Sequence, residues 1–454
     1  MSGKRQKTEE TSTAIEKGEA LETRGEEFET LMATRETEDQ TKLMEEILDA
    51  ENLKRAYKKV VKNGGAPGVD GVTTDDLKSY LAANWNQVRK ELLNGTYKPK
   101  PVKRVEIPKP GGGTRKLGIP TVMDRFIQQA TQQVLQSKWD KTFSEHSFGF
   151  RPGRSAHQAV EQARNYIRAG YRYVVDLDLE KFFDRVNHDI LMDRAAKRIA
   201  DKRVLKVLRA YLNAGILENG LVQAAEEGVP QGGPLSPLLS NLMLDELDRE
   251  LESRKLHYVR YADDCNIYVA SERAGQRVME SITNFLSKRL RLRVNQEKSA
   301  VGKPSKRKFL GFSFVLRAEP KIRLAEQSKE RLKRKIRDLT RPTKGRSLEQ
   351  VIRSIRKYLT GWHGYFRLCQ TPSIFTALDQ WIRRRIRCYL WRHWKRGRTR
   401  YKELTKRGVT PRTAAIVAGS PKGPWRLSAS PPLQHAIPNE YLYALGLPRL
   451  GSAA

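Results

Sequence analysis

Two adjacent carboxylates, Asp263 and Asp264, lie within YVRYADDCNIYVA at residues 258–270, between two apolar runs that are typical of β-strands. A solvent-facing turn here would normally contain Gly or Asn at its centre, and Ala-Asp-Asp-Cys contains neither. Neighbouring carboxylates repel each other, and burial would force a proton onto one of them. Paired cations would offset that repulsion, while the apolar flanks would hold the carboxylates in place.

A third carboxylate, Asp178, ends a β-type run over 173–178 and lies 85 residues before Asp263. A carboxylate at a strand end and two on a neighbouring hairpin could converge into one cluster of hard oxygen ligands, which suits Mg²⁺. Two such ions about 3.5–4 Å apart activate the attacking oxygen and stabilise the leaving oxygen in phosphoryl transfer. The three aspartates are therefore candidate ligands of a two-metal centre.

Each of these acidic residues also has an ordinary structural explanation. A Tyr-Ala-Asp-Asp match alone is weak evidence, and Asp178 could cap a helix. Asp176 lies on the same strand face as Asp178 and competes with it for the ligand role. Asp184, one helical turn further on, is better explained by a structural role. Only the combination of motifs along the chain favours the catalytic interpretation.

The formal net charge of +34 indicates a polyanionic partner. Residues 1–50 hold 14 acidic and 7 basic side chains, whereas residues 321–400 hold 24 Lys and Arg against 5 Asp and Glu. Nucleic acid fits this density better than a membrane, because no helix pairs a basic face with a broad apolar one. No apolar run reaches the roughly 18 residues that cross a bilayer, and no signal peptide is present, so we expect a cytoplasmic protein. Three dispersed cysteines give neither a disulfide framework nor a zinc site.

The elements that position the candidate residues are visible in outline. Residues 1–40 are polar and acidic, which predicts a disordered leader. Helical patterns begin near residue 41, and Asn52 and Thr74 are expected helix N-caps. The strand patterns are a strand, glycine turn and strand over 102–120, a strand turning into a helix over 171–186, and a strand pair over 308–316. After about residue 320 the pattern is almost wholly helical.

Several motifs occur in the order and spacing of reverse transcriptases: DLEKFFD at 178–184, PQGGPLSPLLSN at 230–241, YADD at 261–264, NQEKS at 295–299 and LGF at 310–312. Among these enzymes the chain most resembles bacterial group II intron-encoded proteins. Further matches to that family are GAPGVDG at 65–71, IPKPGGGTRKLGIP at 107–120, HSFGFRPGRSAHQA at 146–159 and GPWRLSASPPLQHAIPNEYLYALGLP at 423–448. The resemblance covers residues 45–450, and the set is far more specific than any one motif.

The resemblance implies a role for each matching residue. It assigns metal binding to Asp178, Asp263 and Asp264, assisted by the backbone carbonyl of Leu179, with two Mg²⁺ ions and Mn²⁺ as an alternative. The implied nucleotide-binding residues are Lys109 and Arg115 for the triphosphate, Gln231 in the pocket, Phe183 as a gate against a 2′-hydroxyl, and Lys298 near the primer end or phosphates. Arg suits phosphate because its planar fork binds two oxygens at once. The alternative for each is packing or a solvated charge.

The fold implied by the resemblance is α+β, a right-hand polymerase with fingers, a palm built on a small antiparallel sheet, and a helical thumb. The expected parts are the leader over 1–40, a helical N-terminal extension over 41–100, fingers and palm over 101–318, a helical thumb or maturase domain over 319–400, and a small basic DNA-binding segment over 401–454. No His-Asn-His nuclease with paired zinc cysteines follows. We therefore expect no second-strand cleavage, and priming from an existing DNA end.

The basic stretch 354–400 interleaves Trp and Tyr with Arg, as in proteins that hold irregular RNA through stacking and phosphate contacts. The candidate RNA contacts are Arg383, Arg384, Arg385, Trp381 and Trp391. Three successive arginines cannot all face inward, which favours binding. For the tryptophans a packed helix face is an equal alternative, because apolar residues recur every fourth position from Ile382 to Trp394.

These observations predict an RNA-directed DNA polymerase that extends a DNA primer on an RNA template with deoxynucleotides. It would also bind its group II intron RNA as a ribonucleoprotein, for splicing and for mobility into target DNA. One alternative is a non-catalytic RNA-binding splicing factor, against which the intact aspartates argue. Another is a reverse transcriptase recruited to DNA repair or phage defence, which the motifs leave open. An RNA-dependent RNA polymerase would need a smaller residue than Phe183 at the gate.

Overall fold

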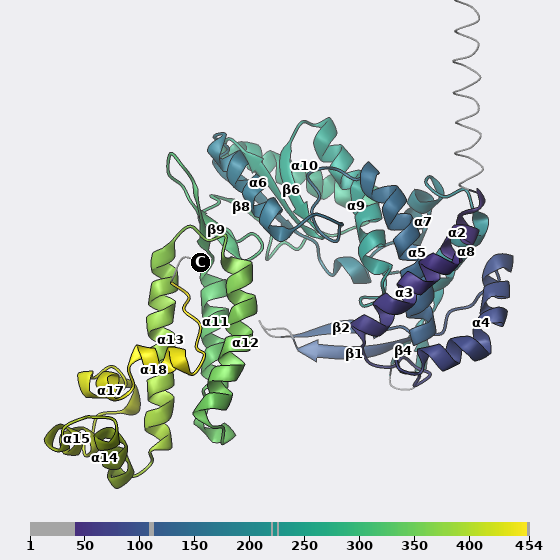
Figure 1. Ribbon diagram of the computed structural model, residues 1–454. Helices are drawn as coiled ribbons and strands as arrows, with labels where there is room; N and C mark the ends of the chain where they lie inside the picture. Colours follow the sequence, from purple (N-terminus) through teal and green to yellow (C-terminus); the bar gives the residue numbers. More distant parts are fainter. Residues whose placement is uncertain (1–40, 109–112, 219–220, 225–226, 452–454) are drawn as a thin grey trace, which may run out of the picture.

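A computed structural model of the chain describes residues 41–108, 113–218, 221–224 and 227–451. The predicted leader and Lys109 lie outside these described residues. The N-terminal extension is helical and consists of α2 (Leu43–Ile47), α3 (Ala50–Asn63) and α4 (Leu77–Asn94). It packs against the first helix of the palm and lies at the right of Figure 1.

Both expected helix N-caps in this extension are wrong. Asp49 caps α3, because its carboxylate accepts from the backbone N–H groups of the two residues that follow the first helical position. Asn52 is buried instead, and its amide donates to the carbonyls of Ile47 and Ala130 at 2.8 and 3.1 Å. Asp76, not Thr74, precedes α4. Sequence alone does not separate a capping side chain from a buried amide that joins two helices.

The fingers contain a four-stranded sheet in the order β2-β1-β4-β5. Its strands are β1 (Val102–Pro108), β2 (Thr114–Ile119), β4 (Ile216–Glu218) and β5 (Leu221–Gln223). β1 and β2 form the predicted antiparallel hairpin, whereas β4 joins β1 in parallel from a segment far along the chain. β4 and β5 were not predicted, because strands of three residues are too short to show a period.

The palm sheet is fully antiparallel and runs in the order β6-β7-β3-β8. Its strands are β3 (Tyr173–Asp178), β6 (His257–Tyr261), β7 (Asp264–Val269) and β8 (Ala300–Gly302). Side chains alternate between its two faces, so Val175 and Ile267 join one hydrophobic core while Val174 and Tyr268 join another. Both faces are therefore covered, and the sheet can hold charged groups only near its ends.

Helices surround this sheet, with α10 against β3, β7 and β8, and α6 against β6 (Figure 1). The helical elements of fingers and palm are α5 (Val122–Trp139), η1 (Asp140–Thr142), α6 (Ala156–Arg168), η2 (Phe182–Asp184), α7 (His188–Ala196), α8 (Lys202–Asn213), α9 (Ser236–Ser253) and α10 (Glu272–Leu290). The helix expected after β3 is only the short 3₁₀ turn η2. Lys181 before it has a φ of +49°, which interrupts helical geometry.

A strand pair follows the palm sheet, and three long helices follow the strand pair. These elements are β9 (Phe312–Val315), β10 (Lys321–Leu324), α11 (Glu326–Leu339), η3 (Pro342–Lys344), α12 (Leu348–Phe366) and α13 (Pro372–His393). The strand pair predicted within 308–316 is wrong in its partner, because β9 pairs with β10 beyond that range. The apolar stripe of α11 is buried in the thumb core at Leu332 and Ile336.

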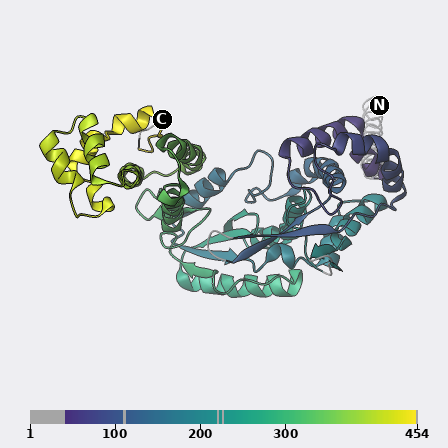
Figure 2. The same cartoon turned by 90° about the horizontal axis from the view of Figure 1, so that it is seen from below.

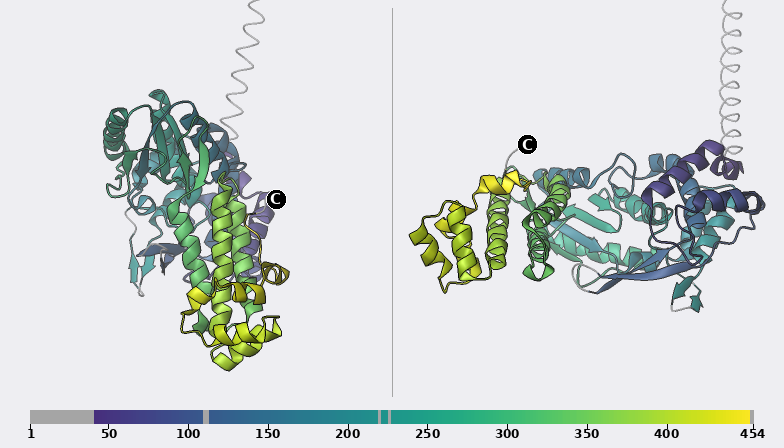
Figure 3. Two further views of the ribbon diagram at one scale, coloured as in Figure 1. Left: turned by 90° about the vertical axis from the view of Figure 1, so that its left-hand side faces the viewer. Right: turned by 60° about the horizontal axis from the view of Figure 1, so that its bottom comes forward.

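Five short helices follow: α14 (Gly397–Lys406), α15 (Pro411–Ala418), α16 (Pro424–Leu427), α17 (Pro431–Ala436) and α18 (Asn439–Ala444). They share one hydrophobic core with α12, α13 and the outer face of the palm sheet. The N-terminal helices and this C-terminal segment lie at opposite ends of an elongated molecule (Figures 2 and 3). In the described part of the chain, no helix has the length and apolar character needed to span a membrane.

Candidate active site

Asp178 and Asp264 face each other at one end of the palm sheet. Asp178 is the last residue of β3, Asp264 is the first of β7, and the two are direct partners in the antiparallel register. Directly opposed residues project from the same face with Cβ atoms roughly 4.5–5.5 Å apart. Asp263 precedes Asp264 in the two-residue turn that joins β6 to β7. The fold thus brings Asp178 next to two carboxylates that lie at least 85 residues further along the chain.

Asp178 is held from the neighbouring segment 294–299. Its backbone N–H donates to Ser299 Oγ at 2.9 Å, and its carbonyl accepts from the Asn295 N–H at 2.8 Å. The Lys298 ammonium lies 3.6 Å from its carboxylate. The next residue, Leu179, bridges to Val294. The NQEKS motif therefore serves, in part, to fix the strand end that presents Asp178.

Asp176, the competing carboxylate, is already paired. The Arg307 guanidinium donates to it from Nε and Nη2 at 2.9 and 2.7 Å. Among the charged neighbours of Asp264, Asp176 raises its pKa the most, which places a fourth acidic group beside the three candidates. Because Asp176 is already bound by Arg307, it is less available than Asp178 as a metal ligand.

The carboxylates at the turn are electrostatically disfavoured as the chain stands. Burial first, and the charges of Asp176, Asp263 and Asp178 next, raise the pKa of Asp264 to about 8. Burial and the charge of Asp178 also raise the pKa of Asp263, and the charge of Arg115 lowers it. Bound cations would reverse both effects, because they favour the ionised form.

The donor set fits a hard divalent cation, since carboxylate oxygens are what Mg²⁺ prefers. In residues 41–108, 113–218, 221–224 and 227–451, no three His, Cys, Asp or Glu side chains are close enough to enclose an ion by themselves. Mg²⁺ usually keeps several waters and takes the rest of its ligands from substrate phosphates. The site therefore fits a metal that is bound jointly with a nucleotide.

Two of the nucleotide-binding candidates, Phe183 and Gln231, line a pocket beside β1 and β2, whereas Arg115, Leu179 and Lys298 do not line it. Arg115 on β2 donates from Nε to Gln231 Oε1 at 2.7 Å, which joins the two motifs. Phe183 and Gln231 both line the pocket, whose empty volume is about 480 Å³, together with Gly228. Phe183 is half-buried and meets Phe182 edge-on at 5.2 Å between ring centroids. Its ring is thus part pocket wall and part core.

The RNA-contact candidates on α13 are engaged within the protein. Arg383 binds Asp379 and Tyr443, and Arg385 donates to Thr340 Oγ1 at 2.9 Å. Arg384 stacks at 4.1 Å over the Trp425 ring and donates to its carbonyl at 2.9 Å. The three arginines point in different directions round the helix, and each joins α13 to another segment.

The two tryptophans differ in burial. Trp391 is only 1% exposed and lies in the thumb core under the Arg400 guanidinium, so the packing alternative holds for it. Trp381 is half-buried beneath the Arg337 guanidinium and keeps an accessible edge. A direct base contact therefore remains a prediction for Trp381 and is not supported for Trp391.

Arg260 and Gly149 contact the turn that carries Asp263, and neither residue was predicted from the sequence. Arg260 is fully buried and donates to the Ala262 carbonyl at 3.0 Å, and Gly149 packs against the Ala262 backbone. A charged residue inside the apolar run YVRY was a usable signal, because a buried charge needs partners. The position of Gly149 depended on tertiary structure and gave no comparable signal.

Known protein families match two parts of this chain. A family model described as reverse transcriptase (RNA-dependent DNA polymerase) matches residues 107–314, and one for the group II intron maturase-specific domain matches residues 329–408. Protein YkfC of Escherichia coli (strain K12) is 35% identical over 300 residues, which cover 57% of this chain and 79% of that protein. The chain belongs to the group II intron reverse transcriptase family.

Two other relatives match this chain over only part of their own length. Group II intron-encoded protein LtrA of Lactococcus lactis subsp. cremoris is 28% identical over 357 residues, covering 64% of this chain and 59% of LtrA. The putative COX1/OXI3 intron 2 protein of Saccharomyces cerevisiae is 28% identical over 335 residues, covering 60% of this chain and 38% of that protein. The match therefore spans less than two thirds of either relative.

Among solved structures, telomerase from Candida albicans in complex with a fragment of telomeric RNA is 14% identical, with a TM-score of 0.42, and the match covers 68% of this chain and 64% of that one. A partial Cas6-RT-Cas1–Cas2 complex is 23% identical, with a TM-score of 0.36, over 54% of this chain and 42% of that one.

Family membership confirms two predictions from sequence: the α+β polymerase fold, and an RNA-directed DNA polymerase with a maturase domain. It also implies, in general terms, a divalent metal requirement and an RNA partner. The roles of individual residues and the domain boundaries stay predictions.

Proposed function

We propose that this reverse transcriptase extends a DNA primer on an RNA template at the carboxylates of Asp178, Asp263 and Asp264. The observation that carries the proposal is the direct pairing of Asp178 with Asp264, with Asp263 beside them in the turn. Two Mg²⁺ ions bound there would activate the primer 3′-hydroxyl and stabilise the leaving pyrophosphate. The Leu179 carbonyl, next to Asp178, would complete the protein's oxygen ligands.

The fingers would hold the triphosphate. Arg115 extends from the β1–β2 hairpin, and Gln231 orients its guanidinium through the Nε bond. A guanidinium so oriented can offer its remaining donors to phosphate oxygens in a bidentate manner. Lys109, in the same hairpin motif, would add a second positive charge. Lys298, already beside Asp178, would approach the primer end or the phosphates.

Phe183 would select the sugar. Its half-buried ring lines the pocket that also contains Gln231 and Gly228. A rigid ring at this wall leaves no room for a 2′-hydroxyl, so deoxynucleotides would be preferred. Packing on Phe182 keeps the ring from moving aside.

The thumb and C-terminal segment would bind RNA and DNA. A groove along α11 and α12 combines aromatic and basic side chains, including Tyr358, Trp362, Lys335 and Lys357. Aromatic faces and lysines together suit a nucleic-acid strand. We infer that these surfaces bind the group II intron RNA for splicing, and target DNA during mobility. RNA that co-purifies with the protein, once sequenced, would identify this partner.

Primer extension on an RNA template tests the polymerase proposal. The unaltered chain with Mg²⁺ and deoxynucleotides should extend the primer, whereas Asp178→Asn should lose at least about 10³-fold of the rate, since it removes one anchor of both ions. The affinity of Asp178→Asn for template–primer should be unchanged, because Asp178 is not part of the thumb groove. Absence of extension by the unaltered chain would leave the non-catalytic RNA-binding function.

A further inference from the structure

Arg260 is a fully buried charge one residue before the YADD sequence. It lies on β6 and is 0% exposed, as is its partner Asp248 on α9. The guanidinium donates from Nε to Asp248 Oδ1 at 2.7 Å and from Nη2 to Asp248 Oδ2. The bidentate pair holds the guanidinium plane in one orientation.

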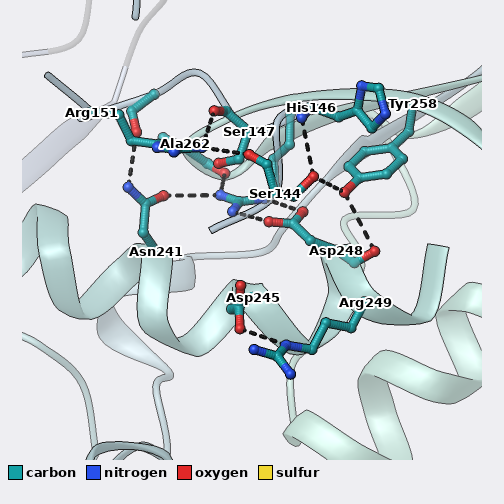
Figure 4. Close-up of polar contacts among 12 residues, drawn as sticks. Ser144, His146, Ser147, Arg151, Asn241, Asp245, Asp248, Arg249, Tyr258 and Ala262 are labelled. Carbon is teal, nitrogen blue, oxygen red and sulfur yellow. Dashed lines mark hydrogen bonds and ion pairs between the residues drawn. The ribbon is translucent and has the colours of Figure 1, made fainter. Parts of the chain in front are cut away.

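The remaining nitrogen of Arg260 reaches the catalytic turn. Nη1 donates to the Ala262 carbonyl at 3.0 Å and to Asn241 Oδ1 at 3.1 Å. The Asn241 amide donates in turn to the Gly149 carbonyl at 2.9 Å. Figure 4 shows Asn241 and Asp248 on one helix, both directed at the segment that carries Ala262. One guanidinium thus links a helix, a loop and the turn.

The turn needs such support because its backbone is unusual. Ala262 has a φ of +57°, a left-handed conformation that residues with a Cβ adopt rarely. Gly149 packs directly against it, since a Cβ at Gly149 would lie 2.3 Å from the Ala262 nitrogen. The position of the turn is therefore set by its surroundings and not by its own sequence.

The loop behind the turn is fixed to the same strand. The Phe148 N–H donates to the Arg260 carbonyl and the Arg260 N–H donates to the His146 carbonyl, both at 2.9 Å. Arg151 ties the end of this loop to Asp140 at 2.9 Å. Any shift of Arg260 would therefore move the loop, the turn and the two carboxylates together.

We propose that Arg260 is a positioning residue for catalysis: locked by Asp248 and Asn241, it fixes the Ala262 carbonyl and so sets where Asp263 and Asp264 meet the metal ions. This inference rests on the proposed metal-binding function of those two carboxylates. Only Arg supplies the four bonds in one plane, because an ammonium group has three donors around a single nitrogen. Arg260→Lys keeps the positive charge but should not keep the Mg²⁺ requirement of the unaltered chain.

The test must separate positioning from folding. Arg260→Met combined with Asp248→Met removes both charges together, which leaves no unpaired buried ion. The matched control is Arg198→Met with Asp245→Met, which removes another ion pair of an α9 aspartate, 2.6 Å in length, whose other polar partners are Arg249 and Thr142. Both double variants should bind template–primer like the unaltered chain.

Two readouts are expected to change only in the Arg260 variant. The half-saturating Mg²⁺ concentration should rise and kcat should fall by about 10–100-fold, the range seen when groups behind metal ligands are removed. The Km for the deoxynucleotide should change little. Direct binding of Mn²⁺ to the complex with a chain-terminated primer, followed by electron paramagnetic resonance, should weaken to a similar extent without any turnover.

Gly149→Ala provides a second perturbation that keeps the ion pair. Its Cβ would lie 2.3 Å from the Ala262 nitrogen and so displace the turn, and the same rise in metal requirement is expected. If the double variant Arg260→Met with Asp248→Met does not fold, Gly149→Ala alone tests the inference. Normal metal binding in the folded Arg260 variant, or failing that in Gly149→Ala, would overturn the inference. Asp264→Asn serves as the separate check: if it remained active, the proposed function itself would fail.

Discussion

Asp264 carries an electrostatic penalty that depends on pH. Its pKa is raised to about 8 from 3.8 by burial and by neighbouring carboxylates, so between these values the folded chain binds a proton that the unfolded chain releases. Stability of the metal-free protein should therefore fall as pH rises from about 4 to 8. Asp264→Asn should remove this loss, and thermal melting should show the metal-free variant gaining stability at pH 8.5 but not at pH 4. Equal gains at both pH values would contradict this.

Metal binding should have the opposite pH dependence. The ions need the ionised carboxylate, so a proton must leave Asp264 when Mg²⁺ binds. The half-saturating Mg²⁺ concentration in primer extension should decrease steadily from pH 6.5 to 8.5. In Asp264→Asn with Mn²⁺, any residual activity should lack this trend. A requirement that is flat with pH in the unaltered chain would argue against Asp264 as a ligand.

Phe183 gives a prediction that concerns specificity. Replacing it with Ala removes the ring from the pocket wall, so ribonucleotides should be incorporated at least about tenfold better relative to deoxynucleotides, which corresponds to ~1.4 kcal/mol. Tyr401→Ala is the control, because it removes an exposed ring on α14 that does not line this pocket. Unchanged sugar selectivity in Phe183→Ala would refute the gate.

At the scale of single residues, the candidate metal ligands were easier to predict from the sequence than the residues that hold the turn in position. The approach of Asp178 to Asp263 and Asp264 could be predicted, because a recognisable strand ends at Asp178 and the other two lie at the tip of a recognisable hairpin. Arg260 and Asn241 could not, since their contact joins a strand to a helix through side chains alone. Trp391 was ambiguous for the same reason: Trp suits both RNA stacking and a core, and only burial decides.

At the scale of elements, the arginines of α13 fasten the C-terminal segment. Arg384→Ala should remove the stacking on Trp425 and one hydrogen bond, at a cost of about 1–2 kcal/mol. Limited proteolysis should then cut the segment after residue 401 sooner, with intact palm helices. Lys402→Ala, at an exposed position, is the control. Weaker RNA binding without altered proteolysis would instead restore Arg384 as a direct contact.

Elements with a clear period were predictable, and those set by distant partners were not. The β1–β2 hairpin, the palm hairpin and the α11 stripe follow from local pattern. β4 pairs with β1 and β5, and β10 pairs with β9, and none of these pairings shows in a local pattern. The short 3₁₀ turn η2 replaced an expected helix where the chain adopts a positive φ at Lys181.

At the scale of the whole molecule, the net charge of +34 governs how binding responds to salt. Each phosphate contact contributes roughly 0.7–0.9 to the slope of log affinity against log salt concentration. Lys335→Ala with Lys357→Ala, in the thumb groove, should lower the slope for template–primer by about 1.5. Lys58→Ala with Lys59→Ala, exposed on α3, should leave it unchanged. If both pairs of substitutions lowered the slope equally, the positive charge would act through the surface as a whole and not through contacts in the thumb groove.

The central claim is that one metal centre lies between the end of β3 and the turn before β7. Fe²⁺ substituted for Mg²⁺ reduces added hydrogen peroxide to hydroxide and a hydroxyl radical, which cuts the backbone beside the ion. Mapping of these cuts in the complex with template–primer and nucleotide should find them near residue 178 and near residues 262–264, and Asp178→Asn with Asp264→Asn should abolish both. Cuts confined to other segments, or cuts that persist in that double variant, would contradict the account.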